Sequence, residues 1–278
     1  MFVILRIIEP EKGYFKARKQ IRNTLRSPAV IHKENGALPF CTVDIIRGKR
    51  GIIWDGTEEK CGRYASRIIA PKSIHLPDDG NLKRYVPSAI KANLIFNTAK
   101  SIIEKANAEP DSFCITVTDK NALLPSKICS LLPYCSCIRV ITAREDKYAV
   151  CAENALNSFG ATLIFRTDYE PTAKPDIVIC CDGITSAAMS EAAVFTFKKR
   201  TCGKLRFCGS GIALTPEHAD FLLDGVDPLD FAGALTELCG CRDYNEACFS
   251  ELGISCGKCA EPKAESCLLC HIRSSAGQ

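Results

Sequence analysis

Short apolar runs recur at regular intervals through the second part of the chain. They lie at residues 113–118, 137–142, 161–166 and 176–181. Each run is nearly continuous in hydrophobic residues, which is typical of a strand buried on both faces of a sheet. Between two of the runs, residues 145–160 have the period of an amphipathic helix, and Gly160 stands where a helix end favours a left-handed residue. Strands that alternate with helices in this way indicate a mostly parallel sheet covered on both faces.

The remaining elements of this part follow weaker signals. Pro125 suits the first turn of a helix after the first strand. Residues 192–200 and 204–211 flank a Thr-Cys-Gly turn, which predicts a hairpin at the sheet edge. Two helices follow, of which the first begins at Thr215-Pro216. Together these patterns predict an α/β fold with a doubly wound, Rossmann-like sheet over residues 110–240.

The first part of the chain mixes strands and helices without that regular alternation. The segments predicted as strands are 2–8 and 40–46, and those with helical spacing are 13–26 and 88–107. The last helix ends before Glu109-Pro110, because the residue before a proline disfavours helical geometry. We therefore predict that an α+β domain ends at this point.

Charge is distributed unevenly between these parts. Residues 1–109 carry 20 Lys and Arg against 11 Asp and Glu, a net charge of +9, whereas residues 110–278 carry 16 against 21, a net charge of −5. This asymmetry supports modules with different surfaces. We expect a basic α+β domain at 1–109, the α/β domain at 110–240 and a short Cys-rich tail at 241–278.

Composition narrows the class of protein. Hydrophobic residues make up 46% of the chain and charged residues 24%, which are values of an ordinary globular protein and exclude a disordered chain. The opening run MFVILRII is interrupted by Arg6 and followed by no small-residue cleavage site, so it predicts a strand and not a signal peptide or an anchor. We expect a cytoplasmic protein with reduced thiols and no membrane partner.

Cysteine is concentrated near the end of the chain. Of 18 cysteines, seven lie between residues 239 and 270, where even spacing would put about two. They include two C-x2-C pairs, Cys256 with Cys259 and Cys267 with Cys270. Two such pairs supply the four thiolates of a closed tetrahedral site, and zinc suits soft ligands in a site without redox change. The pattern predicts a structural zinc site that folds the tail.

Other interpretations of this segment stay open. An iron–sulfur cluster uses the same type of ligand, although neither common ferredoxin spacing is present. His271 offers an alternative fourth ligand, and Cys239, Cys241 and Cys248 could form or complete another site. A redox pair at Cys-Gly-Lys-Cys, or cysteines without any site, are the remaining alternatives.

Polar residues follow the predicted strands, at the edge where open parallel sheets bind ligands. The candidates for cofactor binding are Asp119, Arg144, Asp182, Gly183 and Thr185. Arg144 follows the second strand, where an enzyme that selects NADP needs a cation for the 2′-phosphate. However, the turn TDKNALLP after the first strand has no glycine that would let a pyrophosphate approach the backbone. For Asp182-Gly183 the alternative is an ordinary turn in which glycine has a positive φ.

Catalytic signatures are scarce. The chain has four histidines and no Gly-x-Ser-x-Gly elbow, so a serine hydrolase has no support. His218 lies in the first turn of a predicted helix, where we expect a surface role. Basic residues between Lys16 and Arg26 suit contacts with the phosphates of a nucleic acid, but amphipathic helices routinely carry such a solvated face and no recognised binding motif accompanies them.

These features favour a cytosolic small-ligand-binding or regulatory protein that holds an unidentified ligand between its modules and has zinc as a structural element. The motivation is a polar rim at the strand ends without a catalytic signature. One alternative is an NADP-dependent oxidoreductase that uses Arg144, Asp119 and Asp182. The other is a nucleic-acid-binding protein that uses the basic helix and the tail.

Overall fold

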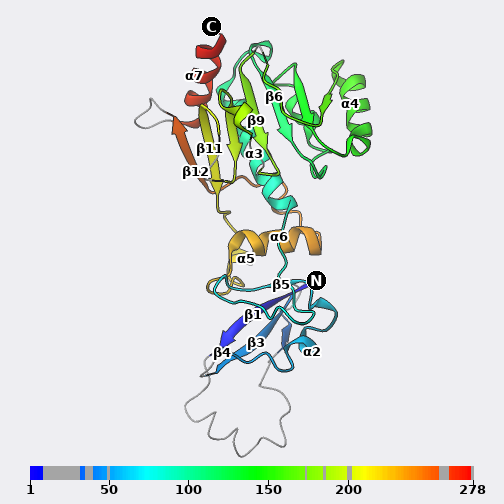
Figure 1. Cartoon of the computed structure of the whole chain (residues 1–278), viewed down its shortest axis with the longest axis vertical. Helices are drawn as coiled ribbons and strands as arrows, with labels where there is room; N and C mark the ends of the chain where they lie inside the picture. The colour runs from blue at the N-terminus through cyan, green and yellow to red at the C-terminus, as the bar shows by residue number, and fades with distance from the viewer. Residues whose placement is uncertain are drawn as a thin grey trace, which may run out of the picture. The chain divides into compact units, whose positions relative to one another are not determined.

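A computed structural model describes residues 1–8, 32–34, 40–48, 51–172, 174–183, 186–198, 202–256 and 263–276 (Figure 1). By their contacts the residues fall into two compact units. Unit 1 comprises Met1–Ser88 and Leu214–Tyr244, and unit 2 comprises Ala89–Ala213 and Asn245–Gln278. These units are not the three segments expected from the sequence, and the predicted domain boundaries stay a prediction. The predicted helix at 13–26 lies outside the described residues.

Unit 1 is built on a small mixed sheet. Its strands are β1 (Phe2–Ile8), β2 (His32–Glu34), β3 (Phe40–Gly48), β4 (Gly51–Ile52) and β5 (Ile68–Ile69). β1 lies between β3 and β5 and is parallel to both, whereas β2 and β4 pair antiparallel with β3. The first four residues of β1 are apolar and buried on both faces of the sheet, and Arg6 interrupts the apolar run after them.

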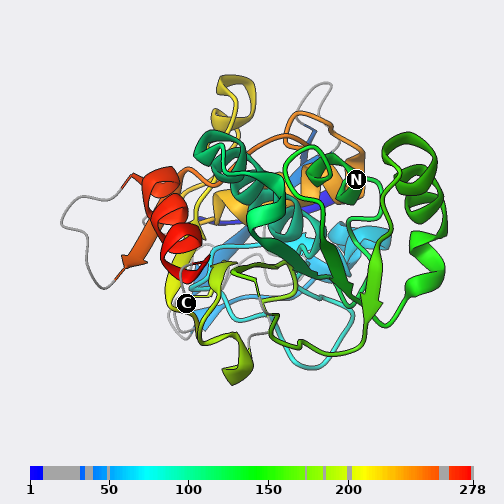
Figure 2. The ribbon, with the colours of Figure 1, turned by 90° about the horizontal axis from the view of Figure 1, so that it is seen from above.

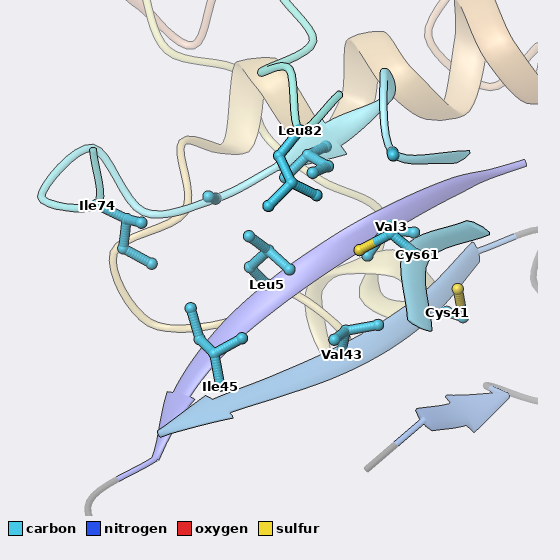
Figure 3. Close-up of a cluster of buried hydrophobic side chains, with 11 residues drawn as sticks. Val3, Leu5, Cys41, Val43, Ile45, Cys61, Ile74 and Leu82 are labelled. Carbon is cyan, nitrogen blue, oxygen red and sulfur yellow. The ribbon is translucent and has the colours of Figure 1, made fainter. Parts of the chain in front are cut away.

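Side chains from both faces of this sheet form hydrophobic clusters. On one face, Val3 and Leu5 of β1 and Val43 of β3 pack with Ile74 and Leu82 from the irregular segment that surrounds β5 (Figure 3). α2 (Thr57–Cys61) adds its last residue to this cluster. The hydrophobic residues of β1 and β3 thus account for the core of unit 1 on this face.

The other face of the sheet carries aromatic side chains. The rings of Phe2 and Phe40 stack with centroids 5.2 Å apart, and Phe231 meets the ring of Phe40 edge-on at 5.4 Å. Phe231 belongs to α6 (Pro228–Cys239), which follows the one-turn helix α5 (Pro216–Ala219). A segment more than two hundred residues from the start of the chain therefore completes the core of unit 1.

Unit 2 contains a seven-stranded sheet in the order β12-β11-β10-β9-β6-β7-β8. The strands are β6 (Cys114–Thr118), β7 (Ile138–Ile141), β8 (Ile164–Arg166), β9 (Asp176–Cys180), β10 (Ala193–Thr196), β11 (Leu205–Ser210) and β12 (Glu251–Cys256). β6 to β11 pair in parallel, and β12 pairs antiparallel with β11 at the edge. The mixed α/β class and the mostly parallel sheet predicted from the sequence are confirmed.

One helix packs against the middle strands of this sheet, and two others lie towards its ends (Figure 1). α3 (Ala89–Ala106) packs against β9 and β10, and α7 (Ala264–Ala276) packs against α3 and β11. α4 (Ala149–Phe159) lies at the opposite end, between β7 and β8 in the sequence (Figures 1 and 2). α4 ends as predicted, because Gly160 has a φ of 62° and its N–H donates to Leu156 O.

Two local predictions are wrong. The segment after β6 is not an α-helix but a series of turns with one short 3-10 helix, η3 (Ile128–Leu131), because the Asp119 carboxylate binds the N–H groups of Leu123 and Leu124 and ties the chain back to the strand end. The predicted hairpin is also wrong, since β10 and β11 are parallel. The antiparallel partner of β11 is β12, from the segment expected to be a tail.

That C-terminal segment has regular structure in unit 2. β12 pairs with β11 over six residues in register, from Leu205 opposite Cys256 to Ser210 opposite Glu251. In α7, Cys267, Leu268 and Ile272 are buried. Hydrophobic packing and strand pairing therefore hold these residues in place.

Candidate functional site at the carboxyl ends of β6 and β9

The strand order of unit 2 reverses between β6 and β9. The chain proceeds from β6 to β7 and β8 on one side, and from β9 to β10 and β11 on the other. β6 and β9 are parallel neighbours, with Thr118 opposite Cys180 at their ends. The connections leave these two ends in opposite directions, and open parallel sheets bind ligands at such a point.

A pocket of about 60 Å³ lies at this edge. Its lining residues come from the ends of four strands and are Thr118, Lys120, Ile141, Thr167, Asp168, Tyr169, Asp182, Ser186 and Met189. One lysine, two carboxylates and two threonines thus surround a small space beside a tyrosine and a methionine. This mixture supplies donors and acceptors of hydrogen bonds together with a limited apolar wall.

Asp182 is the predicted residue that lies in this pocket. The Thr118 hydroxyl donates to its Oδ1 at 2.8 Å, which links the ends of β6 and β9. Gly183 follows with a φ of 66°, and its N–H donates to Cys180 O at 3.2 Å. A Cβ at this position would lie 2.6 Å from Cζ of Phe197, so a side chain is excluded both by the turn and by its neighbour.

Asp119 lies at the end of β6 but faces inwards. Only 1% of the residue is exposed. Its carboxylate accepts hydrogen bonds from Leu123 N at 2.9 Å, Leu124 N at 2.8 Å and the Tyr148 hydroxyl at 2.6 Å. Burial and this bond raise the pKa of Tyr148. The backbone N–H groups that a ligand phosphate would use in this loop are therefore bound by the protein's own carboxylate.

Arg144 and Thr185 are the remaining residues that were predicted to bind a cofactor. Arg144 is exposed, and its Nε donates to Oδ1 of Asp146 at 3.3 Å, which lowers the pKa of that carboxyl. It is not among the residues described as lining the pocket. Thr185 lies outside the described residues. Of the five candidates, Asp182 and Gly183 are therefore the two that the structure places at the pocket or directly beside it.

Tyr169 connects the pocket to a buried charged network that was not predicted from the sequence. Arg139 of β7 binds the carboxylate of Asp176 in β9, and its Nη2 donates to the Thr116 hydroxyl at 2.7 Å. Tyr169, which lines the pocket, donates to the same carboxylate at 2.9 Å. Arg139 is 8% exposed and Asp176 5%. A charged residue inside each of two apolar strands was the signal in the sequence, because buried charges require partners.

The thiols at the end of β9 are poor nucleophiles. Burial raises the pKa of Cys180 to about 12, and it raises that of Cys181 well above its usual value. A thiolate is the reactive form of cysteine, so both side chains are protonated at neutral pH. We assign them to packing beneath the strand ends.

The cysteines of the C-terminal cluster are divided between the two units. Cys239 and Cys241 belong to unit 1, whereas Cys248, Cys267 and Cys270 belong to unit 2. In α7 the Cys267 side chain is buried and that of Cys270 is exposed. The side chain of Cys256 and all of Cys259 lie outside the described residues. The four-cysteine zinc site therefore stays a prediction.

His271 shares the buried face of α7 with Cys267, one helical turn away. Burial lowers the pKa of its imidazole, and its Nε2 has no hydrogen-bond partner in the described part of the chain. A neutral, buried imidazole near a buried thiol is compatible with the predicted role of His271 as an alternative ligand.

No protein-family model matches this chain, and comparison with curated proteins and with solved structures likewise finds no match. Among the described residues, no helix has both the length and the apolar character needed to cross a membrane.

Proposed function

We propose that the protein binds a small polar ligand at the carboxyl ends of β6 and β9, as a ligand-binding or regulatory protein. The observation that carries the proposal is the pocket at the place where the strand order reverses, lined by Thr118, Lys120 and Asp182. Its volume of about 60 Å³ suits one polar group and not a whole cofactor. The ligand therefore inserts a single group between the strand ends.

The lining residues restrict the chemistry of that group. Asp182 already accepts from Thr118, and its position beside Lys120 puts opposite charges on the same pocket. A group with both a hydrogen-bond donor and an acceptor complements this pair, whereas a purely apolar group leaves the carboxylate unsatisfied. We infer a hydroxylated or amino-bearing ligand, because two carboxylates and one lysine line the pocket.

The test is a ligand screen read as a shift in thermal unfolding, since a ligand that binds the native state stabilises it. We expect Asp182→Asn and Lys120→Ala to weaken any hit at least tenfold. Lys105→Ala, an exposed lysine in the last turn of α3, is the matched control and should leave affinity unchanged. Hits that bind all three variants equally would refute the proposed site.

The second candidate function is an NADP-dependent oxidoreductase. The parallel strands follow the order β8-β7-β6-β9-β10-β11, which is the order of the doubly wound, Rossmann-like dinucleotide-binding sheet. Arg144 follows β7, the strand whose end faces the 2′-phosphate in that arrangement. Against it, Asp119 binds the N–H groups of the first loop, and η3 is too short to direct a helix dipole at a pyrophosphate.

Fluorescence titration with NADPH separates the two candidates. Saturable binding that is weakened by Arg144→Ala but not by Arg273→Ala, an exposed arginine of α7, would favour the oxidoreductase. Absence of binding at millimolar concentration would eliminate it. We retain the ligand-binding protein as the first proposal because Asp119 already accepts hydrogen bonds from the backbone N–H groups of the first loop that a phosphate would need.

Two further proposals concern the cysteines. Structural zinc held by Cys256, Cys259, Cys267 and Cys270 is supported by their paired spacing. A reducing cytoplasm is supported by the sequence, in which many cysteines lie inside apolar runs and act as small hydrophobic residues. Elemental analysis of Cys270→Ser against the native chain tests the first, with loss of bound zinc expected.

A further inference from the structure

Three potential metal ligands from separate elements come together in unit 1. His218 lies in α5, and Cys241 and Asp243 follow the end of α6. The Nδ1 or Nε2, Sγ and carboxylate oxygen that they offer all lie within 4.8 Å of one another. His218 is 6% exposed, so the surface role predicted for it from the sequence is wrong.

The chain reversal after α6 produces this arrangement. Gly240 has a φ of 73°, and the N–H groups of Gly240 and Cys241 donate to Thr236 O and Leu235 O. This pair of hydrogen bonds ends the helix and turns the chain back. As a result, Cys241 and Asp243 approach a histidine that lies more than twenty residues earlier in the sequence.

The geometry suits one ion. Nδ1 of His218 and Oδ2 of Asp243 are 3.8 Å apart. Two atoms bound to one tetrahedral zinc at ~2.0–2.3 Å are roughly 3.3–3.8 Å apart, so the separation of Nδ1 and Oδ2 matches that of two ligands of one zinc ion. His218 is buried, Cys241 is half-buried and Asp243 is exposed, which leaves access from the carboxylate side.

We propose that His218, Cys241 and Asp243 form a binding site for a borderline-soft divalent cation, of which Zn²⁺ is the best match. An imidazole nitrogen and a thiolate select zinc over magnesium and calcium, which require oxygen ligands. Three protein ligands leave the fourth tetrahedral position for water or a ligand, as in catalytic and not structural zinc sites. This site is distinct from the four-cysteine cluster, because it shares no residue with it.

Two hydroxyl groups contact Nδ1 of His218 and compete with a metal ion for this atom. Nδ1 lies 2.7 Å from the Tyr244 hydroxyl and 3.0 Å from the Thr215 hydroxyl. These contacts fix the ring so that Nδ1 faces Asp243. A metal needs the lone pair of a deprotonated Nδ1, so a metal bound there displaces the hydroxyls of both Tyr244 and Thr215 from this atom. Tyr244 therefore opposes metal binding in the metal-free protein while it keeps the ring in position.

The test uses the purified full chain, stripped with a chelator under reducing conditions and dialysed against Zn²⁺ alone. We expect Cys241→Ser to hold one equivalent less than the native chain and Asp243→Asn to bind that equivalent at least tenfold more weakly. Asp224→Asn, at an exposed position, is the matched control for Asp243→Asn and should bind as the native chain does. Thermal melts of each variant confirm folding.

Co²⁺ supplies a second readout, because a Co²⁺–thiolate bond has a charge-transfer absorption, and Cys241→Ser should lower that absorption by the share of one thiolate relative to the native chain. Tyr244→Phe should keep the equivalent and bind it more tightly, since it removes one of the two hydroxyls at Nδ1. Unchanged zinc content in both Cys241→Ser and Asp243→Asn would overturn the proposal. It would also be overturned if Tyr244→Phe lost the equivalent in a folded protein, because Tyr244 would then be a required ligand and the assigned set would be incorrect.

Discussion

The loops after β6 and β9 leave neighbouring ends of one sheet, yet their carboxylates have different surroundings. Asp119 accepts three hydrogen bonds from its own loop and from Tyr148, and is buried. Asp182 is half-buried, accepts from Thr118 and lines a pocket. A position at a strand end is therefore not sufficient for ligand binding. The number of internal donors decides whether a carboxylate folds the loop or faces a ligand.

The largest expected effect comes from removing the carboxylate that folds its loop. Asp119→Ala leaves two backbone N–H groups and a tyrosine hydroxyl buried without an acceptor, which should lower the free energy of unfolding by about 3 kcal/mol or more. Asp182→Ala should cost about 1 kcal/mol, because it removes one hydrogen bond at a half-buried site. Denaturant unfolding of both variants measures the difference in stability. Equal losses of stability would show that the two carboxylates do not differ in how much they stabilise their loops.

Tyr148 tests one of the three bonds to Asp119. Tyr148→Phe removes the only side-chain donor that the structure describes for this carboxylate, and a hydrogen bond to a charged group is worth about 1.5–3 kcal/mol. We expect a loss in that range from denaturant unfolding. Tyr64→Phe, at a half-buried tyrosine of unit 1, is the control and should change stability by less than about 0.5 kcal/mol.

Alkaline pH should lower the stability of the folded protein through Cys180, at the end of β9. The pKa of Cys180 is raised to about 12 by burial, whereas an unfolded thiol titrates near ~8.5. The folded state therefore keeps this proton at pH values where the unfolded state has lost it. The contribution of Cys180 to the free energy of unfolding is fully present below the unfolded pKa of ~8.5, and it is lost as pH rises towards the folded pKa of about 12. The slope for one thiol is at most about 1.4 kcal/mol per pH unit.

Unfolding at pH 8 and pH 10 measures this effect. Between these pH values the free energy of unfolding should decline less in Cys180→Ala than in the native chain. Thr118, opposite Cys180 in β6, has no titrating group and does not contribute to this decline. The slopes and not the absolute stabilities are compared, because the substitution also removes buried volume. A decline as steep in Cys180→Ala as in the native chain would place the sensitivity at other buried thiols.

The smallest effect concerns the left-handed residue of each loop. Ala122, after β6, has a φ of 52°, a conformation that disfavours a Cβ, whereas Gly183 occupies the equivalent role after β9. Ala122→Gly should leave stability unchanged or raise it by up to about 1 kcal/mol. Gly183→Ala should instead destabilise, since its Cβ would meet Phe197. A destabilised Ala122→Gly variant would indicate that the methyl group packs usefully.

Much of the fold of unit 2 was predictable because it is encoded locally. β6, β7 and β9 are apolar runs of strand length, and α4 ends at a glycine with the expected conformation. Pairing between strands is not local. A Thr-Cys-Gly sequence resembles a hairpin turn whether the strands beside it are antiparallel or, as for β10 and β11, parallel.

For the candidate sites, the positions of residues at strand ends were predictable, but their roles were not. Residues at strand ends were predictable because the end of an apolar run is visible in the sequence. Their roles were not, because whether Asp119 or Asp182 faces a pocket depends on donors supplied by the loop and by α4's neighbour Tyr148. The cluster at His218 was missed because it depends on the chain reversal at Gly240, which brings together residues that have no common motif.

The aromatic contact between α6 and the first strands has a consequence for how the chain folds during synthesis. Phe2 and Phe40 emerge from the ribosome early, but Phe231, which packs on both rings, emerges after every parallel strand of unit 2 that the structure describes. Unit 1 thus cannot complete its core until translation is nearly finished, and nascent chains that stop before residue 214 present two uncovered phenylalanines to chaperones.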